Sequence, residues 1–336
     1  MIKTVFTLDY EIFGNGRGAL RDLVYEPAEK LRAIFEKYRS SLVVFIEAAE
    51  LEIIEAHRGD PAIDIVKRQL REFRAKGFEL GLHLHPQWYN ARYGNGEWQL
   101  DYREYNLCML SSERINQIII RSLTHMQKIL GEPGFIPISF RAGNWLLQPT
   151  REVAKSLAEH GIKVDSSVYK GGLEYAHKLD YRRSRKNGYF WRFSDDVNIP
   201  DPAGMLLEIP TYTRMVPIWR MFTAKRIRLQ QQGAGRNASR YQRVSKLVDY
   251  LRPVYPMKLD FCRLTAAQLI HMFNKEVDKD RANPGLFRPI VAIGHTKDFV
   301  DSGTVQTFLS YLKGNDIPVA TFEEVHAKIM TLDEEQ

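Results

Sequence analysis

The sequence predicts an α/β protein whose parallel sheet closes, or nearly closes, into a barrel. Short apolar runs typical of buried strands alternate with longer amphipathic runs typical of helices along most of the chain. Helix-start signals, such as Pro27 and the capping box formed by Thr265 and Gln268, precede several of the amphipathic runs. Hydrophobic residues make up 44% of the 336 residues, an ordinary share for a globular protein with a sizeable core.

The first half of the chain contains three expected strands separated by helices. The third strand ends at Pro86, because proline cannot donate to the hydrogen-bond ladder of a sheet. In order, we expect a strand at 5–8, a helix at 27–38, a strand at 42–46, a helix between Asp60 and Gly77, and a strand at 78–85.

The second half repeats this alternation, with one interruption between residues 170 and 264. We interpret 170–264 as an insertion on one face of a single barrel domain that spans residues 1–336, and expect one strand within it, at 206–209. Around it we expect helices at 111–130 and 149–161, strands at 138–141 and 162–164, a helix after Thr265, a strand at 290–295, a helix at 303–313, a strand at 317–320 and a final helix.

The net charge of +7 is concentrated in the segment 213–252. This segment carries ten basic side chains and one acidic one, Asp249, so its own charge of +9 exceeds that of the whole chain. It is either a solvated face or a surface for an anionic partner, and the neighbouring apolar side chains, such as Trp219 and Phe222, would suit an anionic membrane or a diphosphate carrier. We expect no nucleic-acid partner, because the segment belongs to no recognisable nucleic-acid module.

Compartment signals favour a cytoplasmic protein, with peripheral membrane contact through the basic segment. Residues 1–7 contain a single lysine and too short an apolar run for a signal peptide, and no run approaches the roughly 18 apolar residues of a membrane span. Cys108 and Cys262 are too few and too far apart for a disulfide framework.

Polar side chains gather at the carboxyl ends of the expected strands. Because successive strand residues point to opposite faces, His83 and His85 project to the same side, as Asp9 and Glu11 do. In a β/α barrel these strand ends converge on one face, where chemistry takes place. The full set is Asp9, Glu11, His83, His85, Arg141, Asp165 and His295.

These residue types fit metal-assisted hydrolysis of an amide or ester. One carboxylate and two imidazoles hold a divalent metal such as Zn²⁺ and leave positions for water and substrate. A second carboxylate can accept a proton from the water, a histidine can protonate the leaving amine, and Arg141 can hold the base carboxylate by a bidentate pair.

Five segments, in order, resemble the motifs of the polysaccharide deacetylases, the NodB-homology group or carbohydrate esterase family 4. They are residues 7–11, 79–83, 139–145, 164–168 and 293–298, and the nearest resemblance is to WbmS-type members from bacterial O-antigen and surface-polysaccharide gene clusters. The resemblance implies a distorted (β/α)7 barrel, with 170–264 outside the motifs, and a metal-dependent N-deacetylase.

By position in these motifs, the resemblance implies roles for five residues. Asp9 matches the catalytic base and His83 the first metal histidine. Arg141 resembles the arginine that orients the base, His295 the catalytic acid, and Asp165 the acid that supports this histidine.

The sequence also departs from the family pattern. The usual adjacent aspartate pair is replaced by Asp9 and Tyr10, and Glu11 stands where some relatives place the metal carboxylate. The second metal histidine normally lies four residues after the first, where this chain has Gln87. Strand geometry puts His85 on the same side as His83, so we expect His85 to be the third metal ligand. Whether His85 or Gln87 completes the metal site stays open.

The expected function is removal of an N-acetyl group from a nucleotide- or lipid-linked sugar in surface-polysaccharide (lipopolysaccharide) biosynthesis. The expected cofactor is a divalent metal, Zn²⁺ first, held by Glu11, His83 and His85. Two alternatives remain. A catalytically degraded barrel would bind glycan or an assembly partner, and a related hydrolase would cleave another C–N bond.

Overall fold

The computed structural model describes residues 1–223, 225, 227–229 and 252–334. Its main sheet is built from β1 (Ile2–Tyr10), β2 (Val43–Glu47), β3 (Glu79–Leu84), β6 (Ser139–Ala142), β7 (Val164–Asp165), β10 (Trp191–Phe193), β11 (Leu206–Glu208) and β14 (Arg288–His295). The order across the sheet is β10-β11-β7-β6-β3-β2-β1-β14. Seven of the strands run parallel, and the edge strand β10 is antiparallel to β11.

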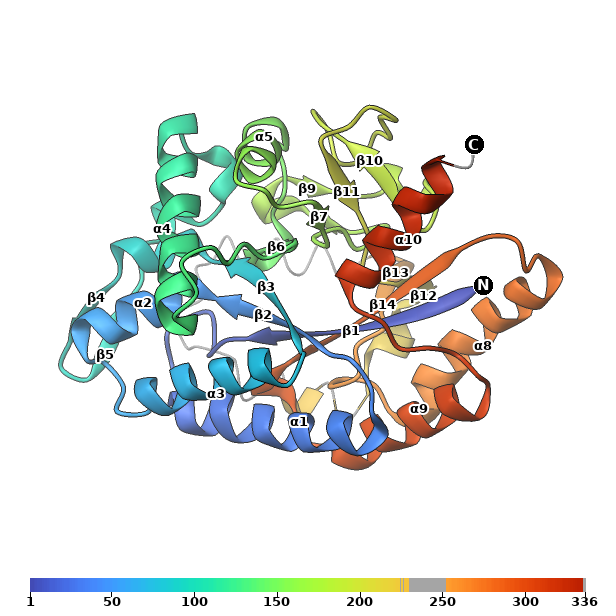
Figure 1. Ribbon diagram of the computed structural model, residues 1–336, viewed down its shortest axis with the longest axis horizontal. Coiled ribbons are helices and arrows are strands. Elements are labelled where there is room, and N and C mark those ends of the chain that lie inside the picture. Colours follow the sequence, from blue (N-terminus) through green and yellow to red (C-terminus); the bar gives the residue numbers. More distant parts are fainter. Residues whose placement is uncertain (224, 226, 230–251, 335–336) are drawn as a thin grey trace.

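The central strands are buried on both faces. In β1, Val5, Phe6 and Leu8 are all fully buried, although Val5 points to one side of the sheet and Phe6 and Leu8 point to the other. Such near-continuous apolar runs are typical of parallel strands that are covered on both sides. Figure 1 shows the sheet as a curved layer with helices arranged around its outside.

The chain after β11 brings the two sides of the curled sheet together. Thr211 forms bridges to Tyr169 and to Val291 of β14, and the Tyr212 amide donates a hydrogen bond to the Val291 carbonyl at 2.9 Å. The sheet therefore curls toward closure around seven parallel strands, which confirms the predicted distorted barrel.

Most helices follow the predicted positions. Thr265 and Gln268 form the expected capping box at the start of α8, and Pro27 lies in the first turn of α1. The helices that cover the sheet are α1 (Glu26–Tyr38), α2 (Ala48–His57), α3 (Ile63–Ala75), α4 (Ser112–Leu130), α5 (Arg151–Glu159), α8 (Ala266–Ala282), α9 (Ser302–Gly314) and α10 (Phe322–Glu334).

Two local predictions were wrong. Helix α2 was not expected, because its apolar residues lie on most of its sides and give no clear amphipathic period. The expected strand at 317–320 is not formed. The chain there pairs with the sheet only through an isolated bridge between Val319 and Thr4.

The range 170–264 contributes to the barrel and also extends beyond it. Strands β10 and β11 join the main sheet, while β12 (Thr213–Pro217) and β13 (Val254–Lys258) form a separate two-stranded ribbon. Two further short ribbons are formed by β4 (Arg92–Gly94) with β5 (Glu97–Gln99) and by β8 (Leu173–Glu174) with β9 (Leu179–Asp180).

Much of the basic segment lies outside the described residues. This applies to Arg226, Arg236, Arg240, Arg243 and Lys246. Within the part of the chain that the structure describes, no helix combines the length and the apolar character needed to cross a membrane.

Candidate metal and catalytic site

The register of the parallel strands brings the expected site residues together. Asp9 pairs with His295 across β1 and β14, and His83 of β3 pairs with Glu47 of β2 on one side and with Arg141 of β6 on the other. Because all these strands run in the same direction, their carboxyl ends meet at one edge of the sheet. The site thus follows directly from the topology.

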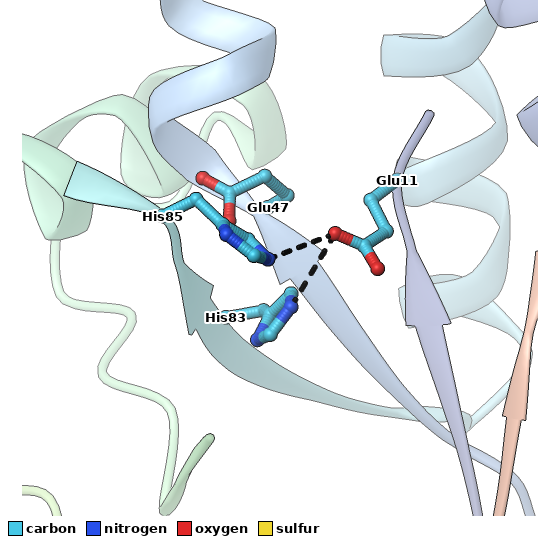
Figure 2. A group of neighbouring side chains, drawn as sticks. All are labelled: Glu11, Glu47, His83 and His85. Atoms are coloured by element: carbon cyan, nitrogen blue, oxygen red, sulfur yellow. Dashed lines mark ion pairs between the residues drawn. The ribbon is translucent and has the colours of Figure 1, made fainter. Parts of the chain in front are cut away.

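Glu11 lies opposite both histidines (Figure 2). Its Oε2 atom is 3.1 Å from His85 Nε2 and 3.5 Å from His83 Nε2, while its Oε1 accepts a hydrogen bond from Lys297 Nζ at 2.7 Å. Burial by itself would raise the pKa of Glu11, but Lys297 and His85 lower it well below its usual range. Glu11 is therefore an ionised carboxylate in the interior.

His83 is oriented by the backbone. Its Nδ1 lies 2.9 Å from the carbonyl oxygen of Arg141, which can only accept, so Nδ1 carries a proton and donates. This arrangement fixes the ring and directs Nε2 toward Glu11, as is usual for a metal-binding histidine. Burial lowers the pKa of His83, but the charges of Asp9 and Glu11 raise it to about 9.

His85 is oriented by side chains instead. Its Nδ1 lies 3.2 Å from Gln87 Nε2 and 3.1 Å from Asn144 Nδ2, while its Nε2 faces Glu11. Gln87 therefore contacts the ring nitrogen on the far side from Glu11. Of the two candidates for the third ligand position, the structure places His85, and not Gln87, against Glu11.

The close approach of β6 to His85 explains the glycine at position 143. A Cβ atom there would lie 2.5 Å from the Leu84 carbonyl oxygen and 2.7 Å from His85 Cγ. The next two residues, Asn144 and Trp145, have left-handed backbone angles, with φ of 54° and 64°. This strained turn places the Asn144 amide on His85.

Glu47 belongs to the same cluster and is not among the site residues expected from the sequence. Ligand atoms of Glu11, Glu47, His83 and His85 all lie within 4.8 Å of one another (Figure 2). Glu47 is fully buried, and burial raises its pKa to about 8. The signal was available, because Glu47 directly follows the expected strand at 42–46.

Asp9 is held on the other side of the site by Arg141. The Nη1 atom of Arg141 donates to Asp9 Oδ1 at 2.7 Å, and the same guanidinium donates to the Ser166 carbonyl at 3.0 Å and hydroxyl at 3.2 Å. The contact with Asp9 is thus a single hydrogen bond and not the expected bidentate pair. Burial raises the pKa of Asp9. The positive charges of Arg141 and of the nearby histidines lower it by more, so the pKa of Asp9 lies below its usual value.

His295 faces Asp9 from β14. Its Nε2 is 3.3 Å from Asp9 Oδ2, and its Nδ1 is 3.7 Å from Asp298 Oδ2. Arg263 donates to this Asp298 carboxylate at 2.7 Å. Burial lowers the pKa of His295, although the charges of Asp9 and Asp298 act in the opposite direction.

The expected role of Asp165 as the support of His295 is wrong. Asp165 accepts hydrogen bonds from the amide and hydroxyl of Ser167, at 2.9 and 2.6 Å, and interacts with Glu208. Among the described residues, the carboxylates within 4.0 Å of His295 belong to Asp9 and Asp298. Asp165 ends β7, which is not adjacent to β14, and both of its carboxylate oxygens are bound by Ser167.

The donor set fits a divalent transition metal. Two imidazole nitrogens and the Glu11 carboxylate converge, and the second nitrogen of His83 is hydrogen-bonded as metal sites require. The second nitrogen of His85 meets Gln87, whose Oε1 is buried without a hydrogen-bond partner in the described structure. Turned by 180°, this amide would accept from Nδ1 and leave the Nε2 lone pair free for a metal.

Comparison with known proteins finds similarity in structure. No family model and no curated protein sequence matches the chain. A Mycobacterium smegmatis protein assigned as a polysaccharide deacetylase matches with a TM-score of 0.56 and 14% identity, over 99% of this chain and 91% of that one. A Pseudomonas aeruginosa protein with the same assignment matches with a TM-score of 0.51 and 14% identity, over 96% and 89%.

A third solved structure, the allantoinase PuuE, matches with a TM-score of 0.50 and 12% identity, over 96% of this chain and 88% of that one. At these identities the similarity concerns the fold. The arrangement of strands around the site and these neighbours lead to one conclusion: the chain has the polysaccharide deacetylase fold.

Proposed function

We propose that this protein is a metal-dependent hydrolase that removes the N-acetyl group from a sugar. The observation that carries the proposal is the convergence of Glu11, His83 and His85 next to an arginine-held carboxylate, Asp9, and a histidine, His295. The fold supports it, because neighbours assigned as polysaccharide deacetylases share it.

Glu11, His83 and His85 would hold the metal. When bound there, a divalent ion would polarise the amide carbonyl and lower the pKa of a water molecule. Lys297 keeps one oxygen of Glu11 occupied, so the other oxygen is directed at the two imidazoles. The three donors thus already lie close together, with their ligand atoms within 4.8 Å of one another.

Asp9 and His295 would move the protons. Asp9 accepts a proton from the attacking water at Oδ2, and the neighbouring Arg141 keeps this carboxylate ionised and ready to do so. His295, whose Nε2 lies 3.3 Å from the same oxygen, would take this proton from Asp9 and pass it to the departing amine as the C–N bond breaks, so that acetate and a free amino sugar leave. Such general acid–base steps contribute roughly 10²- to 10⁴-fold each.

The substrate we propose is an N-acetylated sugar of bacterial surface-polysaccharide biosynthesis, linked to a nucleotide or lipid carrier in the cytoplasm. The five motifs support the reaction class, and the positive charge of 213–252 suits a diphosphate or an anionic membrane surface. Trp145, half-buried in the turn after β6, is an aromatic side chain of the kind that stacks on sugar rings, and the Lys258 ammonium lies 4.1 Å from the centre of its ring.

The test combines metal content with acetate release. The full chain is loaded with Zn²⁺, Mn²⁺ or Co²⁺, freed of excess metal, analysed by elemental mass spectrometry and incubated with nucleotide-linked N-acetylhexosamines. We expect one ion per chain and release of acetate that stops in a chelator. A chain that takes up no ion after loading would contradict metal dependence. Hydrolysis of cyclic amides but not of N-acetyl sugars would favour the C–N hydrolase alternative.

A further inference from the structure

Glu47 has no part in the chemistry described so far, although it lies in the middle of the site. Its side chain is fully buried at the end of β2. Oε1 accepts a hydrogen bond from the Glu50 amide at 3.3 Å, whereas Oε2 has no hydrogen-bond partner within the described residues. Burying a carboxylate oxygen without a partner is costly, so a group that balances it is expected.

The basic side chains nearby are already engaged with other groups. Arg141 binds Asp9 and Ser166, and Lys297 binds Glu11 and the Ile12 carbonyl. Across the described part of the chain, no salt bridge joins Glu47 to a basic side chain. Oε2 of Glu47 is therefore not used by these side chains and is available to a bound cation.

The surroundings of Glu47 are those of a metal ligand. Its nearest ligand-type neighbours are Glu11, His83 and His85, all within 4.8 Å (Figure 2). The register sets Glu47 directly beside His83 on the adjacent strand, so both side chains project from the same sheet edge. A fourth donor thus faces the three that were already assigned.

We propose that Glu47 is a fourth protein ligand of the metal, which gives the site two carboxylates and two imidazoles. This inference rests on the proposed metal-dependent function. Four protein donors would fill a four-coordinate ion completely and leave no place for water or substrate. The working ion therefore has five or six ligands, a coordination that Mn²⁺, Fe²⁺, Co²⁺ and Ni²⁺ adopt readily.

The inference is tested by metal affinity in Glu47→Gln. Glutamine keeps the shape and the bond from the Glu50 amide but loses the charge. Dissociation constants for Mn²⁺, Co²⁺ and Zn²⁺ are measured by competition with a chromophoric chelator. We expect affinity to fall about 10- to 100-fold, since even groups that only orient ligands have effects of that size. Glu47→Asp should lose less, because it retains a carboxylate.

The matched control is Glu50→Gln. Glu50 is also a fully buried glutamate, but its carboxylate accepts from the Ile12 amide at 3.0 Å and is not part of the ligand cluster. Its substitution should leave metal affinity unchanged. Thermal unfolding of all variants in a chelator checks that each one folds.

The visible spectrum of bound Co²⁺ gives a second readout that needs no variant. A five- or six-coordinate ion absorbs weakly, whereas a tetrahedral ion absorbs strongly, so we expect a weak spectrum that intensifies in Glu47→Gln. Unchanged affinity in Glu47→Gln, or an intense tetrahedral spectrum in the wild-type protein, would overturn the inference and leave the proposed function standing. A wild-type chain that binds no metal would instead remove the proposed function itself.

Discussion

Strand β3 carries a buried ionisable residue near each end, Glu79 at its start and His83 near its finish, and the two settings differ. Glu79 accepts hydrogen bonds from the Ser139 hydroxyl at 3.1 Å and the Glu323 amide at 2.9 Å, both neutral donors. Burial raises its pKa to about 7. It serves as a buried carboxyl group that ties α10 to the sheet.

The opposite edge of the sheet, where His83 lies, holds ionised groups from the end of β1 and the residue that follows it. Glu11 is paired with Lys297, and Asp9 with Arg141, so both carboxylates stay charged although they are buried. Burial of an acid is therefore not by itself a sign of function in this molecule. What distinguishes the functional end is that fixed cations hold Glu11 and Asp9 charged beside two histidines and a further carboxylate, Glu47.

The largest effects on metal binding and turnover are expected from substitutions of a metal ligand and of the base, and the two substitutions should differ. His83→Ala removes a metal ligand and should lose both bound metal and turnover. Asp9→Asn keeps the shape of the base and the contact with Arg141 but cannot accept a proton. It should lower kcat about 10²- to 10⁴-fold while metal stays bound. Metal analysis and acetate release on the same samples check this.

Loss of metal in Asp9→Asn would show that Asp9 is itself a ligand. Retention of metal in His83→Ala would show that the ion is held elsewhere. His125, a buried histidine of α4 away from the ligand cluster, provides the control substitution, His125→Gln.

A smaller effect, on stability, is expected at the opposite end of the barrel. The folded pKa of Glu79 is about 7 and lies above its usual value of 4.5, so its contribution to stability is present at acidic pH and is lost as the pH rises toward 7. Linkage sets the change at about 3 kcal/mol at most. In Glu79→Gln this dependence should vanish.

Urea unfolding at mildly acidic and at mildly alkaline pH measures this pH dependence of stability in the wild type and in Glu79→Gln. The difference in unfolding free energy between variant and wild type should shift in favour of the variant as the pH rises, whatever constant cost the lost hydrogen bond adds. Acetate release at neutral pH should be retained, because Glu79 lies at the far end of β3 from the site. An unchanged difference across the pH range would mean that Glu79 is ionised in the folded protein.

Most of the site could be predicted from the sequence because one rule of parallel sheets is strong. The carboxyl ends of the strands meet at one edge, so Asp9, Glu11, His83, Arg141 and His295 were brought together by their positions in the strands alone. The same rule also covers Glu47, which stands at the carboxyl end of the second strand.

What could not be predicted depends on contacts across the barrel and within loops. Asp298 lies three residues after His295 and faces it because the chain turns sharply over Thr296–Asp298, a turn that the apolar pattern does not predict. Lys297 follows the last strand of the sheet in a short turn, and its bond to Glu11 joins residues at opposite ends of the chain. Periodicity carries no information on such a pair.

The smallest expected effect tests how His85 is held compared with His83. The backbone fixes His83, whereas His85 relies on the amides of Gln87 and Asn144, so its ring should be easier to perturb. Gln87→Leu removes one amide and should weaken metal binding about tenfold, at the low end for residues that orient a ligand. Asn144→Gly, which suits the left-handed backbone there, removes the other amide and should have a similar effect.

Gln87→His provides the decisive comparison, because it restores the histidine that the resemblance expects at this position. The side chain at 87 contacts the ring nitrogen of His85 that faces away from Glu11, so an imidazole there would not reach the ion and should not strengthen binding. Affinity that rises above the wild-type value in Gln87→His would mean that position 87 faces the metal. Chelator competition on the three variants measures these differences because all of them leave Glu11, His83 and His85 in place.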